Sequence, residues 1–242
     1  GAPPPASLLS PDRLIVNFND ACVYERDAVK LVPGHRTADL WLNDSCINFW
    51  FRVLEADLGG AAKRIQLMDP AVMAFMRFQA DEEDLEDLGP QLQGRVAIAV
   101  PVNNSSGFFG TPSTHWSLLV CYRSEADEEP VFAHYDSMQP SNSKPALATA
   151  QKLRAALGLS ANGEVQVVPV TMPQQRNGTD CGVYALTVAE LLADVVGAGA
   201  EARAEGGAEP HADGGGEGRA ANAATVAAGA AAEGEGAGAG AS

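Results

Sequence analysis

The stretch Met172-Pro-Gln-Gln-Arg-Asn-Gly-Thr-Asp-Cys181-Gly-Val-Tyr-Ala-Leu186 changes character at its cysteine. The residues before Cys181 are polar and include Pro173 and Gly178, which is typical of a turn. After Cys181, apolar residues recur with the spacing of a helix rather than of a strand. The sequence therefore predicts that Cys181 lies where a loop becomes a helix.

This predicted position suits a nucleophilic cysteine. Unpaired backbone N–H groups and the helix dipole favour the thiolate, which is the reactive form. Gly182 would leave room for a substrate backbone, and Gln175, six residues before Cys181, offers an uncharged N–H donor. We interpret the stretch as a nucleophile with anion-stabilising neighbours.

Composition divides the chain into three parts. Residues 12–196 have the mixed apolar and charged content of one domain, long enough to bury a sizeable core. In residues 197–242, Ala and Gly supply 31 of 46 positions. That tail cannot bury enough apolar surface to offset its ordering entropy, so we predict disorder there. We also predict a flexible leader over residues 1–11, which are proline-rich.

Charge and cysteine content limit the partners. A net charge of −15 argues against nucleic acid or an anionic membrane and is compatible with a basic protein partner. No apolar run approaches the ~20 residues of a membrane span, and no signal peptide is recognisable. The four cysteines lack Cys-x-x-Cys spacing, so neither a metal site nor a redox pair is expected. We expect a monomer with reduced thiols in the cytoplasm or the nucleus, without a cofactor.

The first half of the domain is predicted to be mainly helical after a short apolar run at 14–18. Asn43 or Asp44 can cap a helix that Gly59-Gly60 would end. Asp69-Pro70 favours a second helix, which ends near Phe78. The acidic run 81–87 is interpreted as a solvated helix end or loop, with a partner-contact patch as the alternative.

Strand-like runs follow in the second half. They occupy residues 95–102, 115–122 and 130–136, and the short acidic turn between the last two favours an antiparallel pair. A mobile loop is expected at 103–112. An amphipathic helix over 144–157 and a strand over 165–170 precede the cysteine turn. Helices, then strands, then a nucleophile helix predict one α+β domain.

A thiolate nucleophile needs a base, a group that orients the base, and donors for an oxyanion. Three histidines lie in the domain, and His35 is in a predicted turn. His115 begins a strand after the mobile loop, and Asp136 ends the neighbouring strand, where the two can meet. His134 competes with His115, because it lies two residues from Asp136 and points to the same face. Spacing alone leaves both histidines open, together with the interpretation that all are ordinary polar residues at strand ends.

Four segments in this order resemble the sentrin-specific, ubiquitin-like-protein-processing cysteine proteases. They are Trp41-Leu-Asn-Asp44, Thr114-His-Trp-Ser-Leu-Leu-Val120, Phe132-Ala-His-Tyr-Asp-Ser137 and Pro173–Tyr184, within a match from Leu40 to about Leu192. The resemblance implies a papain-like cysteine protease fold with permuted catalytic order and a central, mostly antiparallel sheet flanked by helices. It also implies the roles of four residues: nucleophile Cys181, base His115, its partner Asp136 and oxyanion donor Gln175.

Within the family, residues 115–120, 134–137 and 141–143 are most similar to the deneddylase branch. Its members process the ubiquitin-like modifier of the neddylation pathway and remove it from cullins and other proteins. The SUMO-protease branch shares the catalytic motifs and is the alternative. Because such modifiers end in Gly-Gly, Trp41 and Trp116 would wall a narrow tunnel, and Asp44 would contact a basic residue of the modifier's tail. Trp41 as plain core and Asp44 as a simple helix cap are the other interpretations.

Two further classes of function remain open at this point. One is a module that binds a ubiquitin-like protein without cleaving it, against which the intact set of four polar residues argues. The other is an acyltransferase that uses the same Cys–His chemistry. Family members also continue with helical structure after the nucleophile helix, whereas the composition here changes soon after Val196.

Overall fold

The computed structural model describes residues 13–31, 41–108, 110–111, 113–123, 129–159 and 164–206. The predicted leader over 1–11 and the turn that contains His35 lie outside these residues. So do most of the acidic turn near residue 126 and the tail beyond Gly206.

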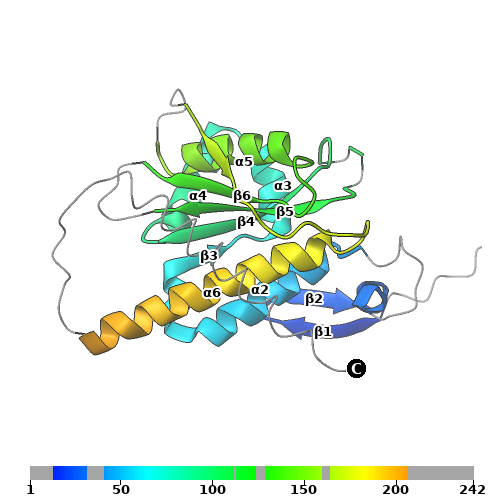
Figure 1. Ribbon diagram of the computed structural model, residues 1–242, viewed down its shortest axis with the longest axis horizontal. Helices are drawn as coiled ribbons and strands as arrows, with labels where there is room; N and C mark the ends of the chain where they lie inside the picture. The colour runs from blue at the N-terminus through cyan, green and yellow to red at the C-terminus, as the bar shows by residue number, and fades with distance from the viewer. Residues whose placement is uncertain are drawn as a thin grey trace, which may run out of the picture.

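A five-stranded sheet with the order β3-β4-β5-β6-β7 forms the centre of the molecule (Figure 1). Its strands are β3 (Ile65–Leu67), β4 (Ala97–Asn103), β5 (Trp116–Tyr122), β6 (Val131–Tyr135) and β7 (Val167–Pro169). The two inner pairs are antiparallel, as predicted for β5 and β6, and each edge strand is parallel to its neighbour. The sheet is therefore mixed, with an antiparallel centre, and the α+β class is confirmed.

Helices cover both faces of this sheet (Figure 1). One face carries α2 (Asp44–Leu58) and α6 (Cys181–Gly206), which pack against each other. The other face carries α3 (Pro70–Phe78), α4 (Glu82–Leu92) and α5 (Ser143–Ala156). Shorter helical turns occupy α1 (Glu25–Ala28), η1 (Val29–Leu31) and η3 (Gly59–Arg64).

Side-chain caps account for where the helices begin. The Asn43 side chain accepts a hydrogen bond of 3.2 Å from the Cys46 N–H at the start of α2. Asp69 accepts one of 2.7 Å from the Ala71 N–H, and Pro70 occupies the first helical position of α3. Asp81 caps α4, so most of the acidic run 81–87 forms the first turns of a helix, with its carboxylates at the positive end of the dipole.

A separate hairpin packs against α2. Its strands are β1 (Leu14–Phe18), which coincides with the short apolar run at 14–18, and β2 (Ala21–Tyr24). The turn consists of Asn19 and Asp20 with φ angles of 47° and 67°. Two consecutive left-handed residues match the right-handed twist of paired strands, and Asn and Asp tolerate this conformation.

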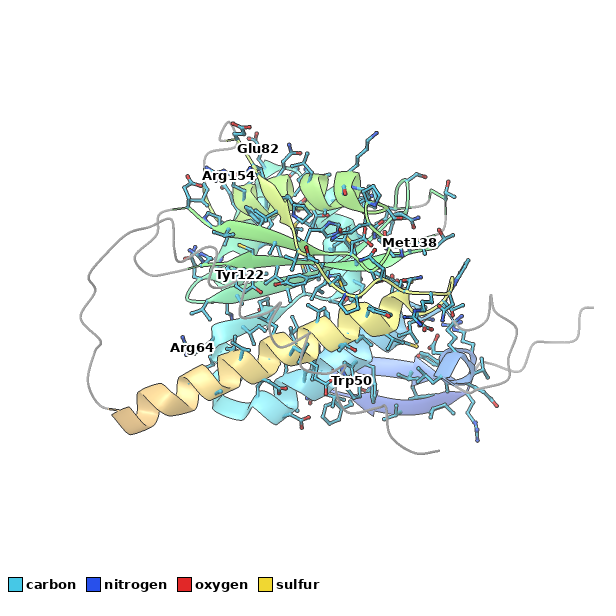
Figure 2. The ribbon with its side chains drawn as sticks, viewed as in Figure 1. Trp50, Arg64, Glu82, Tyr122, Met138 and Arg154 are labelled. Carbon is cyan, nitrogen blue, oxygen red and sulfur yellow. The ribbon has the colours of Figure 1, made fainter. Side chains whose placement is uncertain are left out.

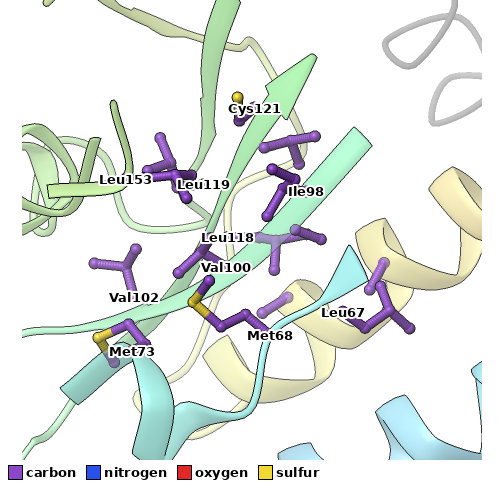
Figure 3. Close-up of a cluster of buried hydrophobic side chains, with 14 of the residues drawn as sticks. Leu67, Met68, Met73, Ile98, Val100, Val102, Leu118, Leu119, Cys121 and Leu153 are labelled. Carbon is purple, nitrogen blue, oxygen red and sulfur yellow. The ribbon is translucent and has the colours of Figure 1, made fainter. Parts of the chain in front are cut away.

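The hydrophobic core extends over both faces of the sheet. All of β4 is buried, as is β5 except for its last residue. Strands buried on both faces appear in sequence as continuous apolar runs, which explains the pattern at 95–102. Figure 3 shows part of this core, in which Leu119 of β5, Leu153 of α5 and Met73 of α3 are fully buried.

Helix α6 begins at Cys181 as predicted but continues to Gly206, so the expected tail boundary at residue 197 falls inside the helix. Alanine is the strongest helix former, which explains the extension. The expectation that no apolar run approaches a membrane span was wrong by length and composition: Cys181–Ala200 has a mean hydropathy of 1.6. The helix nevertheless packs against β5 and α2, and buried core helices pass the same test.

Candidate active site

The predicted catalytic residues gather at one end of the antiparallel pair β5–β6. His115 directly precedes β5, and Asp136 directly follows β6, so the antiparallel pairing places them together. In Figure 2, Met138 lies at this end of the pair and Tyr122 lies at the opposite end. Cys181, the first residue of α6, lies near enough to His115 for each side chain to shift the pKa of the other.

A short hydrogen bond joins two buried side chains at the centre of the site. His115 Nε2 lies 2.7 Å from Asp136 Oδ1, and the two residues are 3% and 0% exposed. Asp136 also accepts the backbone N–H of Met138 at 2.9 Å and that of Asn142 at 3.0 Å. Burial alone would raise the pKa of Asp136, but His115 and the two N–H groups hold this pKa below its ordinary value. Asp136 is therefore ionised at neutral pH.

The pKa values of His115 and Cys181 move in opposite directions. Burial would lower the pKa of His115, but Asp136 and Cys181 together raise it to about 9. Burial would raise the pKa of Cys181, but His115 and the backbone N–H groups of Trp116 and Gly182 hold it below its ordinary value. Because Nε2 is bound to Asp136, Nδ1 is the ring nitrogen left for the thiolate. The arrangement favours a thiolate–imidazolium pair.

His134, the competing candidate, is directed elsewhere. It is buried, and its Nε2 lies 2.9 Å from Ser117 Oγ. Burial is the main reason that its pKa lies below the ordinary value, so it is neutral at pH 7. The structure therefore brings His115, and not His134, together with Asp136 and Cys181.

Gln175 lies on the turn before Cys181 with its amide bound at both ends. Its Oε1 accepts a hydrogen bond of 2.7 Å from the Ser137 hydroxyl, and its Nε2 donates one of 2.7 Å to the Asn177 carbonyl. The Asn177 side chain in turn accepts the backbone N–H of Asp180 at 3.0 Å. These contacts stiffen the turn that leads into α6.

Both predicted tunnel tryptophans make internal hydrogen bonds. The half-buried Trp41 donates through Nε1 to the Gly178 carbonyl at 2.6 Å. The buried Trp116 donates through Nε1 to the Leu42 carbonyl at 2.8 Å. Trp41 is thus not a plain core residue, because it is partly exposed and bound to the nucleophile turn.

Gly182 has a different role from the one expected. A Cβ built at this position would lie 2.9 Å from the Cβ of Leu42, closer than real side chains pack. The missing side chain allows the start of α6 to pack on Leu42. The structure thus explains Gly182 by internal packing rather than by room for a substrate.

Asp44 is exposed at the first position of α2, and the side chain that caps this helix belongs to Asn43. Partial burial of its carboxyl and the nearby Asp69 raise the pKa of Asp44 above its ordinary value. The capping interpretation of Asp44 is therefore not supported. Two neighbouring carboxylates instead form a locally negative surface beside the Trp41 segment.

Two residues of the site were missed as functional candidates. Asn142 is fully buried, and its Nδ2 donates to the Val102 carbonyl at 3.1 Å and to Ser117 Oγ at 3.0 Å. It thus ties β4 to β5 while its backbone holds Asp136. Ser137, which binds Gln175, is 2% exposed. The sequence indicated these two residues only by their positions inside the motif segments. No pattern of neighbouring residues reveals that a polar side chain will be buried.

Two further cysteines, Cys46 and Cys121, are buried in the core. Cys46 packs at the start of α2, and burial raises the pKa of its thiol. Cys121 is fully buried in β5, where burial raises its pKa to about 12. Both thiols therefore stay protonated, in contrast to Cys181.

A thiolate at the start of a helix, paired with an imidazolium that a buried carboxylate orients, defines a cysteine protease site. Residues 40–196 match the family described as the Ulp1 protease family, C-terminal catalytic domain. The chain belongs to this family of cysteine proteases, which act on ubiquitin-like proteins.

Individual relatives agree with this membership. A probable sentrin-specific protease 8 of Dictyostelium discoideum is 29% identical and covers 76% of this chain and 77% of its own. The NEDD8-specific protease 1 of Arabidopsis thaliana is 30% identical, and the match covers 76% of this chain and 77% of that protein.

Solved structures agree in fold. The Xanthomonas campestris effector XopD bound to ubiquitin has a TM-score of 0.53 at 25% identity and covers 80% of this chain and 93% of its own. The Ulp1 protease domain in complex with SMT3, the yeast orthologue of SUMO, has a TM-score of 0.56 at 17% identity and covers 77% and 78%. This second likeness concerns the fold alone.

Proposed function

We propose that this protein cleaves after the C-terminal Gly-Gly of a ubiquitin-like modifier, namely the modifier of the neddylation pathway. Precursors of the modifier and its isopeptide conjugates, such as those on cullins, are the proposed substrates. The observation that carries the chemistry is the buried His115–Asp136 pair at 2.7 Å beside Cys181. Relatives named sentrin-specific protease 8 and NEDD8-specific protease 1 support the choice of modifier.

In the proposed mechanism, the Cys181 thiolate attacks the carbonyl carbon of the modifier's last glycine. The C–N bond to the lysine or precursor amine breaks, and protonated His115 supplies the proton that this amine needs to leave. His115 then accepts a proton from water, whose oxygen attacks the thioester. The modifier leaves with a free carboxylate, and the thiolate is restored.

Two donors are proposed for the oxyanion. The Cys181 backbone N–H is at the first position of α6, where N–H groups lack an intrahelical acceptor. The second is Nε2 of Gln175, which uses one hydrogen for the Asn177 carbonyl and has a second one available. Such donors stabilise charge that develops only in the transition state.

The tryptophans suit a tunnel for two glycines. Both indole N–H groups are engaged with backbone carbonyls, at Gly178 and Leu42. Neither N–H group is therefore available to a substrate, and of the two rings it is the half-buried Trp41 that a substrate can reach, because Trp116 is 4% exposed. In the proposed tunnel a chain without side chains passes beside these rings, which would select for Gly-Gly.

Asp44 is proposed to contact a basic residue in the modifier's tail. It is exposed, lies three residues from Trp41, and has Asp69 as a neighbouring carboxylate. Burial and the neighbouring Asp69 raise the pKa of Asp44, and a cationic partner would offset the repulsion between the two carboxylates.

SUMO and ubiquitin are the second candidates. Ubiquitin is supported by the solved relative in complex with ubiquitin, and SUMO by the catalytic motifs that the SUMO-protease branch shares. The Cys–His chemistry would be unchanged, and only the surface that binds the modifier would differ.

The test uses three modifiers, each carrying an electrophile in place of the C-terminal carboxyl group. The proposal expects a covalent adduct at Cys181 with the neddylation modifier alone, and no adduct in Cys181→Ala, which should still bind that modifier. Labelling by SUMO or ubiquitin alone would contradict the choice of modifier. The lack of any adduct would favour a binding module or an acyltransferase.

A further inference from the structure

Ser137 links the catalytic carboxylate to the turn that carries Gln175. It directly follows Asp136 and is 2% exposed. Its hydroxyl donates a hydrogen bond of 2.7 Å to Gln175 Oε1, and its carbonyl accepts one of 2.8 Å from the Gln175 backbone N–H. One buried residue therefore holds both the backbone and the side chain of Gln175.

These contacts determine which side of the Gln175 amide carries the NH2 group. The Asn177 carbonyl, 2.7 Å from Nε2, can only accept a hydrogen bond. The amide nitrogen must therefore face Asn177, and the amide oxygen faces Ser137, whose hydroxyl is the donor. The second hydrogen of Nε2 has no hydrogen-bond partner among the residues that the structure describes.

We propose that Ser137 is a positioning residue, which keeps the free N–H of Gln175 directed at the oxyanion. This inference rests on the proposed function, in which Gln175 is an oxyanion donor. Without the Ser137 hydroxyl, the amide loses the bond that holds its oxygen away from the substrate. A half-turn of the amide, which only the Asn177 carbonyl would then oppose, would place Oε1 beside the developing negative charge, which it repels instead of stabilising.

The expected effect is on turnover rather than on binding. Ser137→Ala should lower kcat about tenfold with little change in KM, which is less than the roughly 10²- to 10³-fold loss expected for Gln175→Ala. Ser137→Thr keeps the hydroxyl and should retain most of the rate. Ser141→Ala is the matched control, because Ser141 is exposed and its hydroxyl has no hydrogen-bond partner within the described part of the chain.

The decisive experiment is a double-mutant cycle on the full chain, with a fluorogenic C-terminal amide of the modifier as substrate. If Ser137 acts through Gln175, then Ser137→Ala should not slow the Gln175→Ala variant further. An equal fold-loss in both backgrounds, or full activity of Ser137→Ala, would overturn the proposal. An ultraviolet titration of the Cys181 thiolate should be unchanged in Ser137→Ala, because the His115–Asp136 pair is intact. A shifted titration would show that Ser137 acts on the His115–Asp136 pair instead of on Gln175.

The proposed function can fail separately. If the wild-type protein cleaves none of the three modifiers, the function is wrong, but the contact can still be tested by NMR. The side-chain NH2 signals of Gln175 should shift in Ser137→Ala and should not shift in Ser141→Ala. Unchanged signals in Ser137→Ala would show that the hydroxyl does not hold the amide.

Discussion

The indole Nε1 of Trp116 donates a hydrogen bond of 2.8 Å to the carbonyl of Leu42. This bond joins the residue after His115 to the segment that precedes α2. Leu42 also packs on Gly182, at the start of the nucleophile helix. The base, the nucleophile and the N-terminal segment are therefore positioned through one small packed region.

Gly182→Ala tests this packed region. The added Cβ would lie 2.9 Å from the Cβ of Leu42. This atom is attached directly to the backbone, so it cannot move away as the end of a flexible side chain could. We expect a loss of about 1–3 kcal/mol in the free energy of unfolding, measured in urea, and lower activity. Gly60→Ala is the control, since a Cβ at Gly60 meets nothing within 4 Å. Equal stability of the two variants would contradict the packing argument.

The rate should depend on pH in a bell-shaped manner. On the acid side, kcat/KM falls when the Cys181 thiolate becomes protonated. Because the pKa of Cys181 is lowered, this fall occurs at a pH below the ordinary pKa of a thiol. On the alkaline side, it falls near pH 9, where His115 loses its proton. Asp136→Asn removes a cause of the raised pKa of His115 and should move the alkaline limb to lower pH. An alkaline limb that stays in place in Asp136→Asn would show that another group titrates there.

His134 should make the protein sensitive to acid. Its folded-state pKa lies below the ordinary value of 6.5, so the unfolded chain binds a proton that the folded chain excludes. Stability from the neutral ring is therefore present above pH 6.5 and is lost as the pH falls below it. The stability of His134→Gln relative to wild type should therefore increase as the pH is lowered from about 7.5 to about 5, measured by denaturant unfolding. A difference that does not vary with pH would refute this role.

Asn43→Ala should destabilise the protein more than Asp69→Ala, although both remove a helix cap. Asn43 caps α2 and also donates a hydrogen bond of 2.5 Å to the fully buried Asp27. We expect a loss of about 2–4 kcal/mol for Asn43→Ala, because a buried carboxylate loses a partner as well. Asp69→Ala removes the cap of α3 and also relieves the repulsion between Asp69 and Asp44, so it should cost about 1 kcal/mol or less. Equal losses in thermal or urea unfolding would show that the Asp27 bond contributes little.

The parts of the fold with local signals could be predicted from sequence. The caps at Asn43 and Asp69, and the change from turn to helix at Cys181, are encoded within a few neighbouring residues. By contrast, β3 has only three residues and exists through its parallel pairing with β4, which three residues cannot indicate. The extent of α6 was underestimated because an Ala-rich composition suits both a disordered tail and a helix.

The site divides in the same way. His115, Asp136 and Cys181 were predicted from strand ends, a helix start and the family resemblance, and the structure brings them together. The bond between Ser137 and Gln175 joins residues 38 positions apart, so no local pattern indicates it. The same holds for Asn142, whose contacts exist only after β4, β5 and β6 have assembled.

The position of Cys181 on α6, the last helix that the structure describes, has a consequence for biosynthesis. A ribosome extends the chain from its N-terminus, so the base and the carboxylate emerge well before the nucleophile. The sheet that carries them also lacks the cover of α6 until that helix has emerged and docked. A chain whose synthesis has not passed Cys181 therefore lacks the nucleophile and is proteolytically silent, and activity begins only after α6 has docked on the sheet.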